Sequence, residues 1–264
     1  MNCGYVWGKW SVFACLLAVL FLSGNMYGQA GWQTPVRIDA GTGTVSYHPA
    51  IAMNKNGKAM AVFTQGVSST KKKIHASWFD GTGWSTPVKI DANITSTAFE
   101  QVAVNDNDRA IAVFEEGMLY ANHFVDGAWS GAVAVGGYST YNPQVAMGND
   151  NTAIVLYVQD SKLYATHYDG SAWGGKYLLS SGQVPTSYSL PIHQIKMDNN
   201  GNAMVVFVQD DHLYSTRFNG SSWETAVRID TGTSAVSSPS LSMNGSGEAV
   251  AVYRQGFIYA SHFK

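Results

Sequence analysis

The sequence has little that would cross-link the chain covalently or attract charged partners. Its 264 residues include two cysteines, Cys3 and Cys15. A chain that has lost these positions contains no disulfide, no thiolate metal ligand and no cysteine nucleophile, so its stability must come from packing. Charged residues make up 13% of the sequence, with 16 Lys and Arg against 18 Asp and Glu. This balance favours neither nucleic acid nor an anionic membrane surface as a partner.

Long apolar runs are also scarce. One run, SVFACLLAVLFLS at residues 11–23, follows Lys9 and precedes the small residues Gly28 and Ala30. It is shorter than the roughly 20 residues that a membrane-spanning helix needs, and its flanks are those of a secretory signal peptide. We predict that residues 1–30 are removed after Ala30 and that residues 31–264 form one exported domain without a membrane span, secreted or periplasmic. In the alternative, a lipoprotein, Cys15 would be lipidated, but most of the apolar run would then follow the cleavage point.

One hairpin recurs along the chain. It is spelled IHASWFDGTGW at 74–84, LYANHFVDGAW at 119–129, LYATHYDGSAW at 163–173 and LYSTRFNGSSW at 213–223. The tryptophans of the repeat are spaced by 44 to 52 residues, at Trp32, Trp84, Trp129, Trp173 and Trp223. Each tryptophan begins a strand such as WSTPVKID (84–91). Within a repeat, the first strand is a short apolar one such as PAIAM (49–53) and the second is one such as KAMAVFTQ (58–65). The recurring hairpin then supplies the third strand and leads into the tryptophan strand. Four short strands per repeat are typical of a β-propeller blade.

The repeats predict an all-β, five-bladed β-propeller with four antiparallel strands per blade. The blades cover about 49–90, 100–135, 143–179, 191–229 and 239–264 plus 31–38. The segments related to KAMAVFTQ are apolar on both faces, as strands packed between neighbouring blades must be. The last repeat stops at Lys264 without its tryptophan strand, and GWQTPVRID at 31–39 has that sequence. We therefore expect the N-terminal strand to complete the last blade and close the ring, which removes a free sheet edge.

A polar turn follows the first strand of each repeat. NKNGK at 54–58 recurs as NDNDR, GNDNT, DNNGN and NGSGE, with residues that tolerate a positive φ at one position: Gly57, Asp108, Asn151, Gly201 and Gly247. These turns predict tight hairpins. A calcium loop is the alternative, but each copy offers at most two carboxylates, whereas a calcium site uses several oxygen ligands.

The hairpin SWFDGTGW resembles the Asp-box of sialidase-type propellers. Ser77, Gly81 and Trp84 match the spacing of that box, while Asp80 stands one residue late. In that family the box is a structural turn remote from the active site, so the resemblance implies a blade and no activity. A sialidase also needs a clustered arginine triad, whereas Arg37 and Arg228 here fall on outer strands, Arg109 in a turn on the opposite face, and Arg217 and Arg254 in different blades. A glycosidase needs carboxylates of distinct roles around one centre, whereas near-identical repeats favour equivalent sites. We therefore expect no enzymatic activity and no cofactor.

The strongest candidate for a binding site is a polar ring at the ends of the KAMAVFTQ-like strands, formed by Gln65, Glu116, Gln159, Gln209 and Gln255. One interpretation is that these side chains hydrogen-bond the backbone of neighbouring loops. In the other, they bind sugar hydroxyls while aromatic residues of the same face stack on the sugars, namely Tyr47, Phe99, Tyr141 and Tyr188. Several equivalent sites would give avidity.

A second ring lies near the end of the third strand of each repeat, at Trp78, His123, His167, Arg217 and His262. Each of these residues is expected to face a neighbouring blade. Because Trp and Arg replace His in this ring, a structural role fits better than metal coordination.

In blade number, repeat length and near-equivalent repeats, residues 31–264 resemble five-bladed lectins of the tachylectin-2 type and exported bacterial propeller lectins. The specific lectin motifs are not matched, so that resemblance implies the fold more than the function. We expect a monomeric protein that binds glycans and holds no metal. The alternative is a scaffold propeller that binds cell-surface proteins.

Overall fold

All regular secondary structure that the structure describes is β-strand. The computed structural model describes residues 31–39, 41, 46–68, 71–92, 98–186 and 192–264, and the predicted all-β class is confirmed there. No helix in these ranges is long and apolar enough to cross a membrane. The chain divides into two units, Met1–Val36 and Arg37–Lys264. Within the first, residues 31–36 are exposed and form no strand, and the predicted cleavage point at Ala30 lies outside the described residues.

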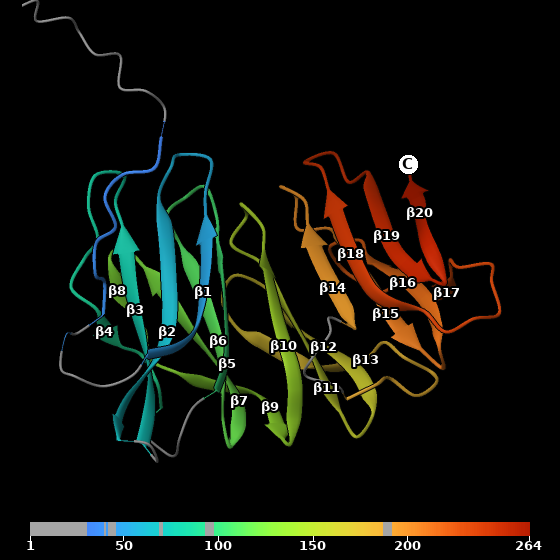
Figure 1. Cartoon of the computed structure of the whole chain (residues 1–264), viewed down its shortest axis with the longest axis horizontal. Helices are drawn as coiled ribbons and strands as arrows, with labels where there is room; N and C mark the ends of the chain where they lie inside the picture. The colour runs from blue at the N-terminus through green and yellow to red at the C-terminus, as the bar shows by residue number, and fades with distance from the viewer. Residues whose placement is uncertain (1–30, 40, 42–45, 69–70, 93–97, 187–191) are drawn as a thin grey trace, which may run out of the picture. The chain divides into compact units, whose positions relative to one another are not determined.

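The second unit consists of five antiparallel sheets in chain order (Figure 1). The first contains β1 (Ser46–Met53), β2 (Ala59–Ser68), β3 (Lys71–Phe79) and β4 (Val88–Lys89). The second contains β5 (Ala98–Val104), β6 (Ala110–Glu116) and β7 (Met118–Val125), with β8 (Ala128–Trp129) and β9 (Val133–Tyr138) both paired to β7. The third contains β10 (Thr140–Met147), β11 (Ala153–Gln159), β12 (Lys162–Tyr168) and β13 (Trp173–Leu178). The fourth contains β14 (His193–Met197), β15 (Ala203–Gln209), β16 (His212–Phe218) and β17 (Val227–Arg228), and the last contains β18 (Ser237–Met243), β19 (Ala249–Gln255) and β20 (Phe257–Phe263).

The strand order predicted from the repeats is confirmed among the described strands, because successive strands of a sheet pair with each other; the exception is β9, which pairs with β7 beside β8. The last sheet differs from the prediction: it has three strands, and residues 31–38 form no strand. This is the one predicted strand pairing that joins the two ends of the chain, whereas the others are local hairpins with a small loop-closure cost.

In the described residues the core forms four separate apolar clusters, one between each two successive sheets. The second strand of a sheet contributes to two of them, because successive side chains point to opposite faces. In β11, Val155 and Tyr157 pack toward the second sheet, while Ile154 and Leu156 pack toward the fourth. All four are completely buried. This explains why the segments related to KAMAVFTQ are apolar on both faces.

The turns between the first and second strands interlock from sheet to sheet. Asn54 Nδ2 donates to the carbonyl of Asn105 at 3.2 Å, and Asn105 Nδ2 donates to the carbonyl of Gly148 at 3.1 Å. The predicted positive φ is found at all five equivalent positions, from 60° at Asp108 to 90° at Gly247. These turns are therefore hairpins, as predicted, and their asparagines bind the next turn.

The inner strands carry a bulge that the sequence analysis missed. The register shifts in β1, β5, β10 and β18, each time at a residue with positive φ: His48, Phe99, Asn142 and Ser238. Proline follows three of these residues, and His193 occupies the position equivalent to Pro49 in β14.

His193 is completely buried, and its Nε2 donates to the carbonyl of Asn142 at 2.8 Å while its Nδ1 has no partner. Burial lowers the pKa of His193 to about 4.

Asn105→Ala should destabilise the protein by about 2–4 kcal/mol, because Asn105 is buried and its amide both donates to the next turn and accepts from Asn107 and Arg109 N–H groups. Asn107→Ala is the matched control, since the exposed Asn107 amide makes one bond to the Asn149 carbonyl, and it should cost under about 1 kcal/mol. Urea denaturation measures both. Equal losses would contradict the interlocking role of Asn105.

The stability of the protein should fall as the pH drops from 7 to 4, partly because of His193. The unfolded chain protonates this residue near its ordinary pKa of 6.5, whereas the folded chain does so only at about 4. Between these two pKa values the unfolded state binds a proton at His193 that the folded state does not bind. The free energy of unfolding therefore falls by about 3 kcal/mol between pH 7 and pH 4. His193→Gln removes that proton uptake, so the difference in unfolding free energy between wild type and variant should change by this amount between pH 7 and pH 4. A pH-independent difference would show that His193 titrates normally.

Candidate functional site

The predicted polar ring lies at the ends of the second strands, but its side chains bind the protein itself. Four of the five are buried, and Gln159 is half-buried. Glu116 Oε2 accepts the Ala92 N–H at 2.8 Å, Gln209 Oε1 accepts the Ser181 N–H at 2.8 Å, and the Gln159 amide donates to the Tyr138 carbonyl at 3.0 Å. Gln255 donates to the Ser234 carbonyl at 2.8 Å and to Asp230 at 2.9 Å.

Ala92, Ser181, Asp230 and Ser234 belong to the links that follow the outer strands of the preceding sheets, and Tyr138 is the last residue of the outer strand β9. The ring therefore fastens each link to the next sheet. Of the two interpretations that the sequence left open, this geometry supports loop binding, and a sugar-binding role for the ring stays a prediction.

The aromatic residues predicted beside this ring are not gathered into one described platform. Phe99 and Tyr141 are half-buried at the bulges of β5 and β10, and Tyr141 packs against the apolar cluster between the third and fourth sheets. The backbone of Tyr47 pairs with Thr64 in the first sheet, but its side chain lies outside the described residues. Tyr188 lies outside them altogether.

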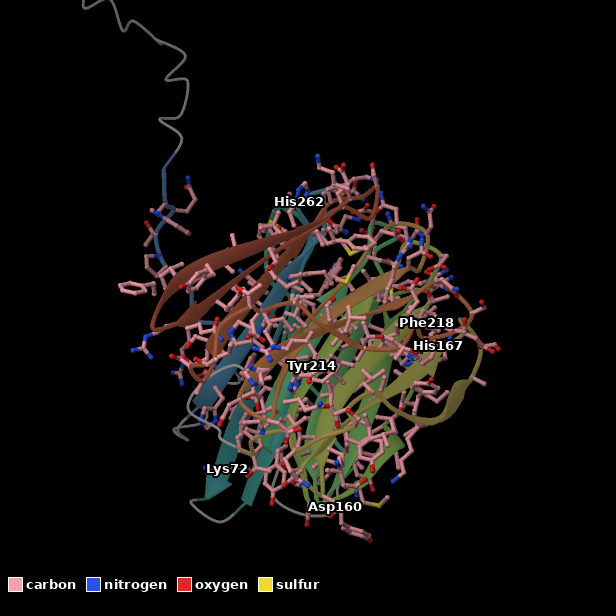
Figure 2. The ribbon with its side chains drawn as sticks, turned by 90° about the vertical axis from the view of Figure 1, so that its right-hand side faces the viewer. Lys72, Asp160, His167, Tyr214, Phe218 and His262 are labelled. Carbon is pink, nitrogen blue, oxygen red and sulfur yellow. The ribbon has the colours of Figure 1, made fainter. Side chains whose placement is uncertain are left out.

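The second ring connects neighbouring sheets, as predicted. Each of its first four members contacts an aromatic ring on the third strand of the next sheet. Trp78 lies 5.5 Å from Phe124, His123 lies 4.2 Å from Tyr168, and His167 lies 4.8 Å from Phe218 between ring centroids. The Arg217 guanidinium lies 5.7 Å from the centroid of Phe263. Figure 2 shows His167 beside Phe218, with His262 of the last sheet away from both.

A groove opens between the first and second sheets, on the outer side of this aromatic contact. Its volume is about 880 Å³, within the range of small-molecule sites. Trp78, from β3, and Trp129, from β8, line it together with Phe124 of β7. Phe124 contacts both indoles, at 5.5 Å and 5.4 Å between centroids, so the three rings form a continuous aromatic surface.

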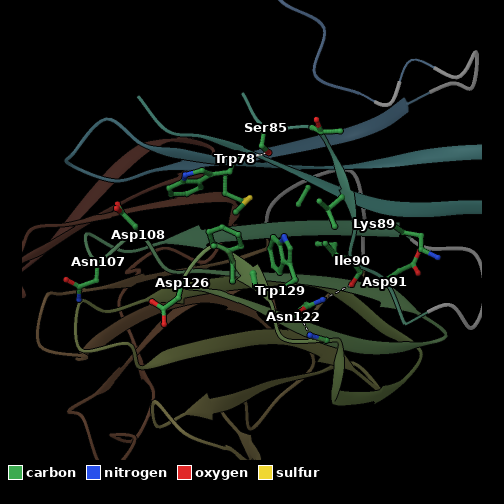
Figure 3. A pocket seen from close by; sticks show the side chains of 18 residues that line it. Trp78, Ser85, Lys89, Ile90, Asp91, Asn107, Asp108, Asn122, Asp126 and Trp129 are labelled. Carbon is green, nitrogen blue, oxygen red and sulfur yellow. Dashed lines mark hydrogen bonds between the residues drawn. The ribbon is translucent and has the colours of Figure 1, made fainter. Parts of the chain in front are cut away.

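Polar side chains border the aromatic surface of the groove at both ends. Figure 3 shows Asn107, Asp108 and Asp126 on one side of the indoles, and Lys89, Asp91 and Asn122 on the other. The Asn122 amide is already used between the sheets, because it donates to the Ile90 carbonyl at 2.8 Å and accepts the Gly131 N–H at 3.1 Å. The hydrogen bond from Lys58 lowers the pKa of Asp108, which keeps this carboxylate charged at neutral pH.

The charged groups that line the groove are one lysine, Lys89, and three carboxylates, Asp91, Asp108 and Asp126. Asp108 is paired with Lys58, and Asp91 lies 3.8 Å from Lys73, so the lining has little net charge to attract a charged ligand. An uncharged molecule with an apolar face and several hydroxyl groups fits better, because indoles stack on apolar faces and carboxylates accept hydrogen bonds from hydroxyls.

Sequence reasoning assigned the groove residues a structural role. One signal for the groove was present: Trp78 is the one tryptophan in a ring otherwise made of His and Arg. The equivalent place between the fourth and last sheets also holds a cavity, of about 170 Å³, where Arg217 and Glu224 replace Trp78 and Ser85. The grooves therefore share their position and differ in chemistry.

The tryptophan hairpins are held by an aspartate or asparagine side chain of the turn itself. Asp80 Oδ1 accepts the N–H groups of Thr82 and Gly83 at 2.8 and 2.9 Å, and Asp169 and Asn219 do the same in the third and fourth sheets. The Gly83 N–H, followed by the Thr82 hydroxyl, lowers the pKa of Asp80 to about 2. These side chains serve the turn. Among the described residues, no group of three or more His, Cys, Asp or Glu could hold a metal ion.

No protein-family model and no curated protein matches the sequence. Similar solved structures include a Hadza microbial sialidase, with a TM-score of 0.54, 10% identity and coverage of 83% of this chain and 53% of that one. A mutant of AofleA from Arthrobotrys oligospora has a TM-score of 0.51 and 13% identity, with coverage of 71% and 58%. The fungal lectin of Aleuria aurantia, whose fold is a six-bladed β-propeller, has a TM-score of 0.49 and 14% identity, with coverage of 82% and 74%. Similarity at these identities concerns the fold alone.

Proposed function

We propose that the protein is an exported, non-catalytic propeller that binds neutral glycans in the groove between its first and second sheets. The observation that carries this proposal is the aromatic surface of Trp78, Phe124 and Trp129, bordered at both ends by polar side chains. Sugars present apolar faces and hydroxyl edges, and this is the combination that such a groove complements.

The proposal includes a monomeric ring of five blades and export by the N-terminal signal peptide. It moves the predicted glycan site from the polar ring to the groove, because the ring side chains bind links of the protein. The sequence predicted repeated, equivalent sites. We propose instead that the sites share a position in the repeat and differ in chemistry, since Arg217 and Glu224 replace Trp78 and Ser85 in the cavity between the fourth and last sheets.

The alternative is a propeller that binds a cell-surface protein. An observation in its favour is the row of exposed apolar side chains on the last sheet, which includes Val250, Val252 and Phe257. Protein interfaces use such surfaces.

Trp129→Ala should weaken glycan binding at least tenfold, because it removes one of the two indoles that line the groove. A glycan array identifies the ligand, and calorimetry then compares variant and wild type. Trp84→Ala is the matched control: Trp84 contacts Phe79 at 5.3 Å much as Trp129 contacts Phe124 at 5.4 Å, but it does not line the groove. We expect similar losses of stability and unequal losses of binding.

The Gln159→Ala, Tyr141→Ala double variant separates the groove from the polar ring. If the glycan binds in the groove, this variant keeps its affinity for the glycan. If the double variant loses binding and Trp129→Ala does not, the site lies at the ring. If the array shows no glycan and a surface protein binds instead, the alternative function holds.

A further inference from the structure

The cavity between the fourth and last sheets contains a pair of opposite charges that the groove lacks. Its volume is about 170 Å³, and its lining includes Arg217 of β16 and Glu224, which precedes β17. The equivalent residues of the groove, Trp78 and Ser85, are uncharged. The cavity is therefore a site of different chemistry, and its ligand must be inferred from these two side chains and the walls around them.

Arg217 is the member of its ring with a permanent charge. Trp78 is uncharged, and burial lowers the pKa of His123 and of His167, so both imidazoles are neutral at pH 7. A guanidinium remains protonated. In the described structure the Arg217 Nε is buried without a hydrogen-bond partner, and the guanidinium lies over the Phe263 ring, 5.7 Å from its centroid. A ring face does not supply the oxygen acceptor with which a charged donor forms its strongest bonds.

Glu224 provides a second charge that is not neutralised. Its N–H donates to the Arg217 carbonyl at 2.8 Å, so the two residues are neighbours across the hairpin. Both line the cavity, yet their side chains form no ion pair in the part of the chain that the structure describes. Glu224 is exposed, whereas the Arg217 Nε is buried. The negative group therefore lies nearer to solvent than the buried nitrogen, and both charges can bind a ligand.

The remaining walls of the cavity are mainly apolar. Side chains that are at most 5% exposed form much of them: Met204, Val206, Leu241, Ala249 and Ala251. Two hydroxyls of the lining already bind the protein, since Thr216 Oγ1 donates to the Glu224 carbonyl at 2.7 Å and Ser261 Oγ to the Ile229 carbonyl at 3.2 Å. An engineered apolar cavity of about 150 Å³ holds benzene, so these walls have room for one apolar group of about that size.

We infer that this cavity binds a free α-amino acid with an apolar side chain of about the size of leucine. The ligand carboxylate accepts the buried Arg217 N–H, its ammonium group donates to the Glu224 carboxylate, and its side chain contacts the apolar walls. A ligand with only one of the two charges would leave the other charged side chain without a partner. A peptide would exceed the cavity, which is smaller than the roughly 300 Å³ at which sites for larger molecules begin. This site goes beyond the proposed function and is independent of glycan binding in the groove.

Ligands that each lack one charge test the inference. Calorimetry on the protein compares L-leucine with 4-methylpentanoate, which lacks the ammonium group, and with 3-methylbutylamine, which lacks the carboxylate. Leucine should bind at least about tenfold more tightly than either, because each missing group removes a charge-assisted hydrogen bond. Binding of 4-methylpentanoate as tight as that of leucine, or no binding of leucine, would overturn the inference.

A variant of the arginine tests which side chain binds the carboxylate. Arg217→Met keeps the apolar length of the side chain and removes its charge, so it should weaken leucine binding at least about tenfold. Arg254→Met is the matched control, since Arg254 is an exposed arginine of β19 that does not line the cavity, and it should leave the affinity unchanged. Urea denaturation confirms that both variants fold. Equal affinities of the two variants would contradict the assignment of Arg217.

Glu224→Gln is a second variant, at an exposed position where folding is not at risk. It should weaken the binding of leucine and leave that of 4-methylpentanoate equal or stronger, because the carboxylate that repels this probe is gone. A purely structural role of Glu224 would change the two ligands alike. A Glu224→Gln variant that keeps the preference for leucine over 4-methylpentanoate would overturn the zwitterion site.

Discussion

The rest of the structure depends on the burial of the second strands of the first four sheets, β2, β6, β11 and β15, on both faces. In β6, β11 and β15, side chains alternate between the cluster shared with the preceding sheet and the cluster shared with the next. At roughly 25 cal/mol per Å² of apolar area removed from water, such strands supply much of the stability of a chain that has no cysteine after Cys15. A sheet of this kind is stable only between two neighbours. The demand for neighbours explains the repetition.

Polar side chains then fix the spacing between the sheets at both ends. At one end the turn asparagines, such as Asn54 and Asn105, bind the carbonyls of the next turn. At the other end Glu116, Gln209 and their counterparts bind the preceding link. Because these groups are buried and hydrogen-bonded, each would be costly to leave without its partner, so they hold the sheets at one separation.

The groove is a consequence of that separation. Successive sheets come closest at their inner strands, as β1 does to β5 and β14 to β18, and diverge toward their outer strands, so the third strands meet only through long side chains. Where both contributors are large aromatic residues, as Trp78 and Phe124 are, a wide groove with an aromatic surface results. Where Arg217 meets Phe263, the cavity is smaller. The fold thus provides two equivalent positions whose chemistry differs with the residues of the repeat, Trp78 and Ser85 in one and Arg217 and Glu224 in the other.

The sequence by itself determined the all-β class, the strand order within each sheet, the tight turns at Gly57 and its counterparts, and the contact of the second ring with the next sheet. These features follow from local periodicity and turn chemistry, which a repeat displays several times. Only the tertiary structure decided that the polar ring serves the links and that Trp78 and Trp129 line a groove. The sequence around a glutamine at the end of a strand does not show whether its side chain faces solvent or a neighbouring loop. Trp129 and Trp84 likewise occupy equivalent positions in the repeat. What separates them is the sheet packed beside each one, which is a property of tertiary packing.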